Sequence, residues 1–168
     1  DLQNKRLKAV GIAAERFQED ALRMMRGLRF VSQLGFDLEE QTQAAITTHA
    51  PLLSKISVER ICIEFEKLLL GQNVQQAFQL FIATDCFKYC PELSDKRHLL
   101  RQMSEILRFP IEDLSVAWGL LIDQLAIDSK HQKSFLKEWK LSNQRIHEVL
   151  LLREALEIIK QRPLDVLD

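Results

Sequence analysis

Apolar residues recur at intervals of three and four positions along nearly the whole chain, which is the spacing of a single buried face on an α-helix. Alternation of apolar and polar residues, the pattern of a half-buried strand, does not persist beyond a few positions. We therefore expect an all-α protein, a multi-helix array of roughly seven to eight helices with short loops and no sheet.

Capping and breaking residues set the expected boundaries of these helices. Gly35 should end the first helix, and Pro51 follows the second. Ser57 is a good N-cap for the third helix, and Ser142 or Asn143 opens the last. After an irregular start over residues 1–13, the expected helices cover residues 14–34, 39–49, 58–71, 73–84, 95–107, 111–127, 130–139 and 143–161.

Composition narrows the class of protein. With 168 residues the chain can form one domain, or two small ones, around a real core. Its net charge of −1 means that any contact with nucleic acid has to come from a local patch. The five glycines are isolated, so they form no glycine-rich phosphate loop. No apolar run approaches the roughly 20 residues of a membrane span and no signal peptide is present, so we expect a cytoplasmic protein without membrane contact.

The cysteines indicate free thiols. Cys86 and Cys90 have helical spacing, but no second pair and no suitably spaced histidines accompany them, so we expect no zinc site. Together with Cys62 they make an odd set of three, which is typical of reduced thiols in the cytosol.

The segment RFQEDALRMMRGLRF, residues 16–30, carries an unusual density of charge for a helix with a buried face. Its charged residues fall on the side of the helical wheel opposite the apolar ones: Arg16, Glu19, Asp20, Arg23 and Arg26. A solvated face laced with acid–base pairs is one interpretation. In a functional interpretation, Asp20 and Arg23, one turn apart, present an acceptor and a forked donor side by side. Gly27 lies one turn further along, where glycine costs about 1 kcal/mol in a helix and leaves room for a ligand.

This segment, followed by SQLGF, resembles the neck motif of the class II tRNA nucleotidyltransferases, the CCA-adding enzymes, whose pattern is approximately R-F-x-E-D-x-L-R-x-x-R-A-x-R-F. The chain departs from that pattern at Gly27, where alanine is usual. Residues 57–71, SVERICIEFEKLLLG, resemble the family's next motif, with its fixed positions in place: Glu59, Arg60, Glu64 and Leu68. Residues 135–146, FLKEWKLSNQRI, are similar to the body of the Gram-positive members.

The resemblance implies a neck at residues 1–71 and a body at residues 72–168, with the catalytic head and the tail absent. In the family a carboxylate pair in the head binds Mg²⁺. Here Glu64 and Glu66 should point to different faces of a helix, whereas two-metal nucleotidyl transfer needs convergent carboxylates. We expect no catalytic and no metal-binding residue in this chain, which should be inactive on its own.

The family uses the neck helix as a protein template that selects CTP and ATP. Cytosine and adenine present an amino donor beside ring acceptors, so Asp20 can accept from the amino group while Arg23 donates to the acceptors. Uracil and guanine place a carbonyl oxygen opposite Asp20, a mismatch of about 1–3 kcal/mol when desolvated. The resemblance adds Arg26 and Arg29 to the nucleotide site. Glu19 can hold the arginine side chains in position, and Arg16 is a further supporting residue. For Arg29, an interhelix ion pair with a group such as Glu64 is an equally open alternative.

A second group of basic residues has the spacing of one helical stripe: Lys130, Lys133, Lys137 and Lys140. Phe135 and Trp139 should then turn towards a core. An ordinary solvated face is one interpretation of the stripe. The other is contact with tRNA phosphates, which would depend strongly on salt.

These patterns predict the neck and body of a bacterial CCA-adding enzyme, whose full-length parent acts on tRNA with CTP and ATP; a homodimer of the parent is left open. One alternative is a bacterial poly(A) polymerase, which shares the neck motif. Another is a non-catalytic helical domain that binds a protein through its charged face.

Overall fold

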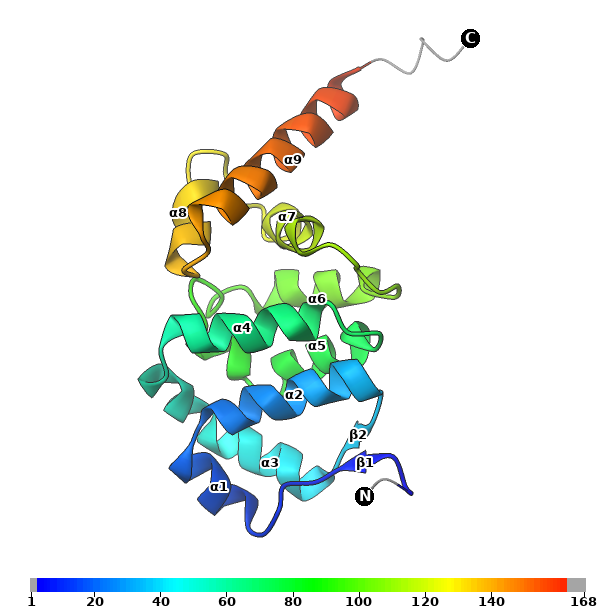
Figure 1. Ribbon diagram of the computed structural model, residues 1–168, viewed down its shortest axis with the longest axis vertical. Helices are drawn as coiled ribbons and strands as arrows, with labels where there is room; N and C mark the ends of the chain where they lie inside the picture. Colours follow the sequence, from blue (N-terminus) through cyan, green and yellow to red (C-terminus); the bar gives the residue numbers. More distant parts are fainter. Residues whose placement is uncertain (1–2, 163–168) are drawn as a thin grey trace.

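The computed structural model describes residues 3–162, and helices dominate that part of the chain (Figure 1). The helices are α1 (Ala13–Glu19), α2 (Leu22–Leu34), α3 (Glu40–His49), α4 (Val58–Leu69), α5 (Val74–Ala83), α6 (Arg97–Ile106), α7 (Leu114–Gln124), α8 (Gln132–Glu138) and α9 (Asn143–Gln161), with two 3-10 helices, η1 (Ala50–Lys55) and η2 (Cys86–Tyr89). The all-α prediction is therefore confirmed. The expectation of no sheet is wrong in one detail, because β1 (Arg6–Leu7) pairs in parallel with β2 (Asp37–Leu38).

The first predicted helix is divided in two. Asp20 lies between α1 and α2 with extended backbone angles, φ −149° and ψ 101°. Its Oδ1 accepts a hydrogen bond of 3.1 Å from the backbone N–H of Leu22, at the start of α2. A short acceptor such as aspartate favours this local bond with the backbone over a place inside a helix. The prediction of one unbroken helix over residues 14–34 was therefore wrong at Asp20.

Most helix ends lie where the capping residues predict them. Gly35 follows α2 in the left-handed region, at φ +69°, which glycine adopts without strain. Ser142 caps α9, since its hydroxyl accepts from the backbone N–H of Arg145 at 3.1 Å. Ser57 occupies the N-cap position of α4, but its side chain makes no capping hydrogen bond.

The helices stack along the long axis of the molecule (Figure 1). The elements α1, α3 and the β1–β2 pair lie at one end, α2, α4, α5 and α6 follow, and α7, α8 and α9 form the other end. The helix α9 runs obliquely outwards towards the C-terminus. No helix in the described part of the chain is long and apolar enough to cross a membrane.

An aromatic cluster joins the middle of this stack to its far end. The Phe65 ring of α4 lies 4.7 Å from that of Trp139 and 5.8 Å from that of Trp118, between ring centroids. Phe81 of α5 lies 5.3 Å from Phe65. The indole N–H of Trp118 donates to Glu66 at 2.8 Å. The predicted neck and body therefore share one continuous core across the boundary at residues 71 and 72, and the division itself remains a prediction.

The three cysteines are free and buried, as predicted for reduced thiols. Burial raises the pKa of the Cys86 thiol to about 12. Burial also raises the pKa values of Cys62 and Cys90 well above the ordinary range of a thiol. These side chains therefore act as small core residues in the folded protein.

Candidate functional site

The charged residues of the opening motif gather at the junction of α1 and α2. Glu19 ends α1, and its Oε2 lies 3.1 Å from Nη1 of Arg16 and 3.6 Å from Nη1 of Arg23. One carboxylate therefore restrains two guanidinium groups.

Asp20 is held by two elements. While Oδ1 accepts from the backbone N–H of Leu22, Oδ2 lies 3.8 Å from Nη2 of Arg60, in the first turn of α4. The Asp20 side chain is 27% exposed, so a ligand can reach it. The break in the helix also changes the relation between Asp20 and Arg23: they do not share one helical face, and the backbone N–H of Arg23 donates to the Asp20 carbonyl at 3.1 Å.

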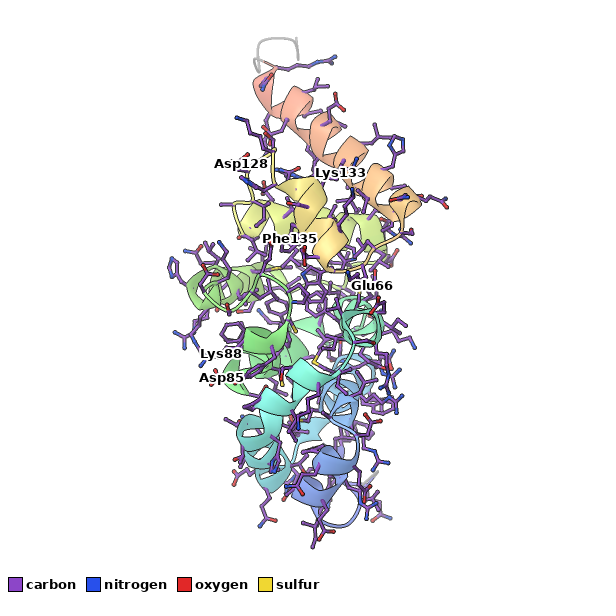
Figure 2. The ribbon with its side chains drawn as sticks, turned by 90° about the vertical axis from the view of Figure 1, so that its left-hand side faces the viewer. Glu66, Asp85, Lys88, Asp128, Lys133 and Phe135 are labelled. Atoms are coloured by element: carbon purple, nitrogen blue, oxygen red, sulfur yellow. The ribbon has the colours of Figure 1, made fainter. Side chains whose placement is uncertain are left out.

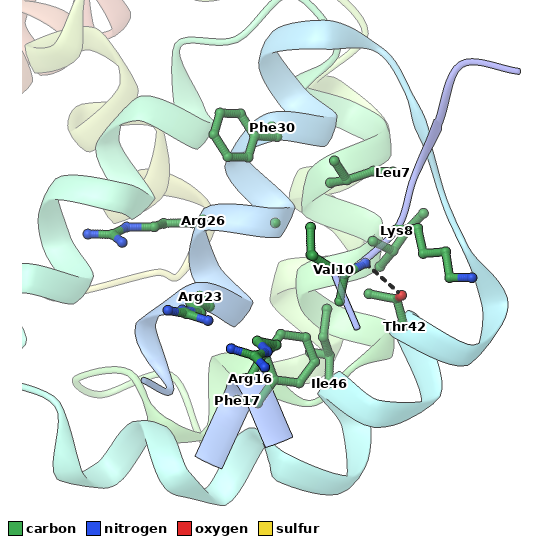
Figure 3. A pocket seen from close by; sticks show the side chains of 13 residues that line it. Leu7, Lys8, Val10, Arg16, Phe17, Arg23, Arg26, Phe30, Thr42 and Ile46 are labelled. Carbon is green, nitrogen blue, oxygen red and sulfur yellow. Dashed lines mark hydrogen bonds between the residues drawn. The ribbon is translucent and has the colours of Figure 1, made fainter. Parts of the chain in front are cut away.

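A pocket of about 260 Å³ lies beside the arginines of α1 and α2 (Figure 3). Arg16, Arg23 and Arg26 contribute to its lining, together with apolar side chains from the N-terminal segment, α1, α2 and α3: Leu7, Val10, Phe17, Phe30 and Ile46. Lys8 also lines this pocket. Four cations beside an apolar cavity suit an anionic ligand with a planar apolar part.

Asp20 lines a different pocket, of about 430 Å³, which it shares with Lys55 and Arg60. Asp20 and Arg23 thus open onto two different hollows, which share Phe17 in their lining. A planar group that contacts both residues has to reach both hollows.

Gly27 lines the pocket beside the arginines, and a Cβ added to it meets no atom within 4 Å outside its own helix. No packing contact within the described chain therefore requires glycine at this position. The alanine of the family pattern would fit the same place.

Arg26 and Arg29 converge on one acid of α4. Glu64 lies 3.5 Å from Nε of Arg26 and 3.1 Å from Nε of Arg29. The side chains of Glu64 and Arg29 are only 6% and 15% exposed, whereas that of Arg26 is 44% exposed. The Arg29 guanidinium also lies 4.5 Å above the Phe30 ring. The ion pair anticipated as the alternative for Arg29 is present, so among these two arginines Arg26 has the greater freedom to meet a ligand.

The two acids considered for metal binding diverge, as expected. Glu64 faces α2, while Glu66 accepts from the Trp118 indole of α7. Within residues 3–162, no group of three or more His, Cys, Asp or Glu side chains is placed to hold a metal ion.

The predicted lysine stripe is shorter than the sequence suggests. Lys133 and Lys137 lie on α8, but Lys130 precedes this helix and Lys140 follows it with a left-handed φ of +62°. The prediction of a helix over residues 130–139 was therefore too long, because α8 covers only Gln132–Glu138. All four lysines are exposed, and Phe135 and Trp139 are buried as predicted. Figure 2 labels Lys133 and Phe135 on α8.

Sequence reasoning missed the place of Arg60 beside Asp20. The motif includes Arg60, but helical periodicity cannot reveal a contact between residues on different helices. The available signal was the position of Arg60 just after the Ser57 cap, at the end of α4 that approaches the break.

Two family models match most of the chain. Residues 35–97 match the model described as the probable RNA and SrmB-binding site of polymerase A, and residues 109–168 match the model of tRNA nucleotidyltransferase domain 2, putative. The CCA-adding enzyme of Enterococcus faecalis is 52% identical over 156 residues, which cover 93% of this chain and 38% of that protein. The chain belongs to the tRNA nucleotidyltransferase family.

Further members of the family agree in sequence and fold. The CCA-adding enzyme of Limosilactobacillus reuteri is 44% identical over 164 residues, 98% of this chain and 41% of that protein. The crystal structure of the Bacillus stearothermophilus CCA-adding enzyme in complex with CTP matches with a TM-score of 0.88 and 40% identity, over 95% of this chain and 40% of that one. The chain thus spans about two fifths of the length of these nucleotidyltransferases.

Proposed function

We propose that this chain is the neck and body of a CCA-adding tRNA nucleotidyltransferase, and that the junction of α1 and α2 selects CTP and ATP by their base edges. The observation that carries the proposal is the presence at this junction of an accessible acceptor, Asp20, and of a donor, Arg23, that Glu19 restrains. The similarity to an enzyme solved with CTP supports the same assignment.

Selection follows from hydrogen-bond complementarity. The Asp20 carboxylate accepts from the amino group of cytosine or adenine, and Arg23 donates to the neighbouring ring acceptor. Uracil and guanine turn a carbonyl oxygen towards Asp20, which leaves two acceptors opposed and costs about 1–3 kcal/mol. The base edge then has to reach both hollows, because Arg23 lines one of them and Asp20 lines the other.

The remaining arginines act through charge and position. Arg26, which is half exposed, faces the triphosphate and favours all four nucleotides alike. Glu19 keeps the side chains of Arg16 and Arg23 from extending freely into solvent. These side chains therefore lose less conformational freedom when the nucleotide binds. Arg29 contributes mainly by fixing α2 on α4 through Glu64.

The family resemblance implies that the full-length parent would bind Mg²⁺ through its head. In this chain Glu64 and Glu66 diverge, so they are not placed to share an ion. Mg²⁺ would neutralise charge on the transferring phosphoryl group there. The body supplies contacts with tRNA, in which Lys133 and Lys137 of α8 face the tRNA phosphates. The parent would act in the cytoplasm.

Nucleotide incorporation by the full-length parent tests this function. A tRNA that ends before CCA is incubated with Mg²⁺ and each nucleoside triphosphate in turn, and 3′-end extension is measured. Incorporation of C and then A supports the proposal. Addition of A alone to unrelated RNAs would indicate a poly(A) polymerase, and no extension with any nucleotide would leave a non-catalytic binding domain. The 168-residue chain alone should extend nothing.

A further inference from the structure

We infer that Arg60 is a positioning residue for base selection, which acts by orienting the carboxylate of Asp20. The inference rests on the proposed function, because it assigns to Asp20 the contact with the amino group of the base. Arg60 comes from α4, outside the charged helix pair that suggested the site.

Asp20 is restrained at both carboxylate oxygens. The backbone N–H of Leu22 binds Oδ1 at 3.1 Å, and the Arg60 guanidinium stands 3.8 Å from Oδ2. The first contact fixes one oxygen at the start of α2. The second sets the direction of the other oxygen, the one free to accept from a base.

The arginines of α1 and α2 do not replace Arg60 in this role, and Lys55, which lines the same pocket as Asp20, forms no ion pair with it. Arg16 and Arg23 are engaged by Glu19 instead. Within residues 3–162, the ion pair that Asp20 forms is the one with Arg60.

Stability does not account for the contact. The Arg60 and Asp20 side chains are 51% and 27% exposed, and an ion pair with that exposure adds little to folding. The start of α2 depends on the bond from Leu22 to Oδ1, which does not involve Arg60. Loss of Arg60 should therefore leave the fold intact and let Oδ2 turn away from the base edge.

The test uses the full-length parent and measures kcat and KM for CTP and UTP with Arg60→Ala, Arg60→Lys and Lys67→Ala. Lys67 is an exposed cation on the same helix, so Lys67→Ala removes one charge from α4 without touching Asp20. Arg60→Ala should lower the CTP-to-UTP ratio of kcat/KM by about two- to fivefold, the effect of one exposed ion pair, with KM for CTP raised and KM for tRNA unchanged. Arg60→Lys should restore the ratio in part, because the ammonium keeps the charge but not the planar fork. Lys67→Ala should keep the wild-type ratio.

Combination with Asp20→Ala shows whether Arg60 acts through Asp20. In that background Arg60→Ala should change the ratio no further. A full second loss in the double variant, or a wild-type ratio in Arg60→Ala, overturns the inference while Asp20 keeps its role. If Asp20→Ala also keeps the wild-type ratio, both the inference and the proposed base contact are wrong.

Discussion

Arg29 and Glu64 face one another in the contact between α2 and α4, with 3.1 Å between Nε and Oε2. Neither atom meets hydrogen-bond geometry, so the interaction is an ion pair rather than a directed bond. Both side chains are largely buried, which makes the charge of each dependent on the other.

Removal of one charge from this pair should destabilise the fold strongly. Glu64→Gln leaves the buried Arg29 guanidinium uncompensated, and we expect a loss of about 3 kcal/mol in the free energy of unfolding. Arg26→Ala, which removes the more exposed partner of the same acid, should cost about 0–1 kcal/mol. Urea denaturation of the two variants measures the difference, and equal losses would contradict the assignment of Arg29 to the α2–α4 contact.

Two glycines should respond to alanine in opposite directions. At Gly27 a Cβ meets open space, so Gly27→Ala should stabilise α2 by up to about 1 kcal/mol. At Gly71 the added Cβ would stand 2.0 Å from Ser32 Oγ and 2.6 Å from the Ser32 backbone, where α4 ends against α2. Gly71→Ala should therefore cost about 1–3 kcal/mol or more. Thermal melting of both variants measures these changes in stability. A Gly27→Ala variant that is less stable than the wild type would mean that α2 needs glycine at this position.

Asp85 should make stability depend on acid pH. Partial burial raises the pKa of this carboxyl. Hydrogen bonds from Arg97 and Lys88 lower the pKa by more than burial raises it, so the pKa lies below its ordinary value of 3.8. As the pH falls, Asp85 is protonated in the unfolded chain before it is protonated in the folded protein. The stabilisation by ionised Asp85 is therefore complete above the ordinary pKa and is lost as the pH falls through the pKa of the folded state. The difference in unfolding free energy between the wild type and Asp85→Asn should be constant at neutral pH and shrink below about pH 4. A difference that does not change with pH would mean that the charge of Asp85 is unimportant.

The lysines of α8 should contribute to the salt dependence of tRNA binding by the full-length parent. Replacement of Lys133 and Lys137 with alanine should weaken binding and reduce the slope of log affinity against log salt by about 1–2. Replacement of both with arginine keeps the charge and should keep the slope. If the alanine variant retains the wild-type slope, these lysines form an ordinary solvated face.

Sequence reasoning predicted local features better than contacts between helices. Gly35 and Ser142 mark helix ends through their own backbone and side-chain chemistry, so these boundaries could be read directly. The break at Asp20 was missed because the charge pattern continues with helical spacing across it, although the capping ability of aspartate was visible. The β1–β2 pair was missed because two residues per strand give no measurable alternation.

The arrangement of the candidate site depends on tertiary packing. The position of Arg60 beside Asp20 follows from how α4 lies against the α1–α2 junction, which no periodicity encodes. The division of Asp20 and Arg23 between two hollows likewise arises from the break in the helix. The residue types of the site were therefore predictable from the motif, but their relative orientation was not.

The ratio of CTP to UTP incorporation by Asp20→Ala in the full-length parent tests the central claim most directly. The substitution also removes the acceptor for the Leu22 N–H, which can cost about 1 kcal/mol, so circular dichroism and melting must first show that the variant is folded. Without the carboxylate that opposes a carbonyl oxygen, UTP should gain relative to CTP by about tenfold, which is within the 1–3 kcal/mol of an unpaired acceptor. A folded Asp20→Ala variant with the wild-type rate and the wild-type ratio of CTP to UTP would contradict base selection at the α1–α2 junction.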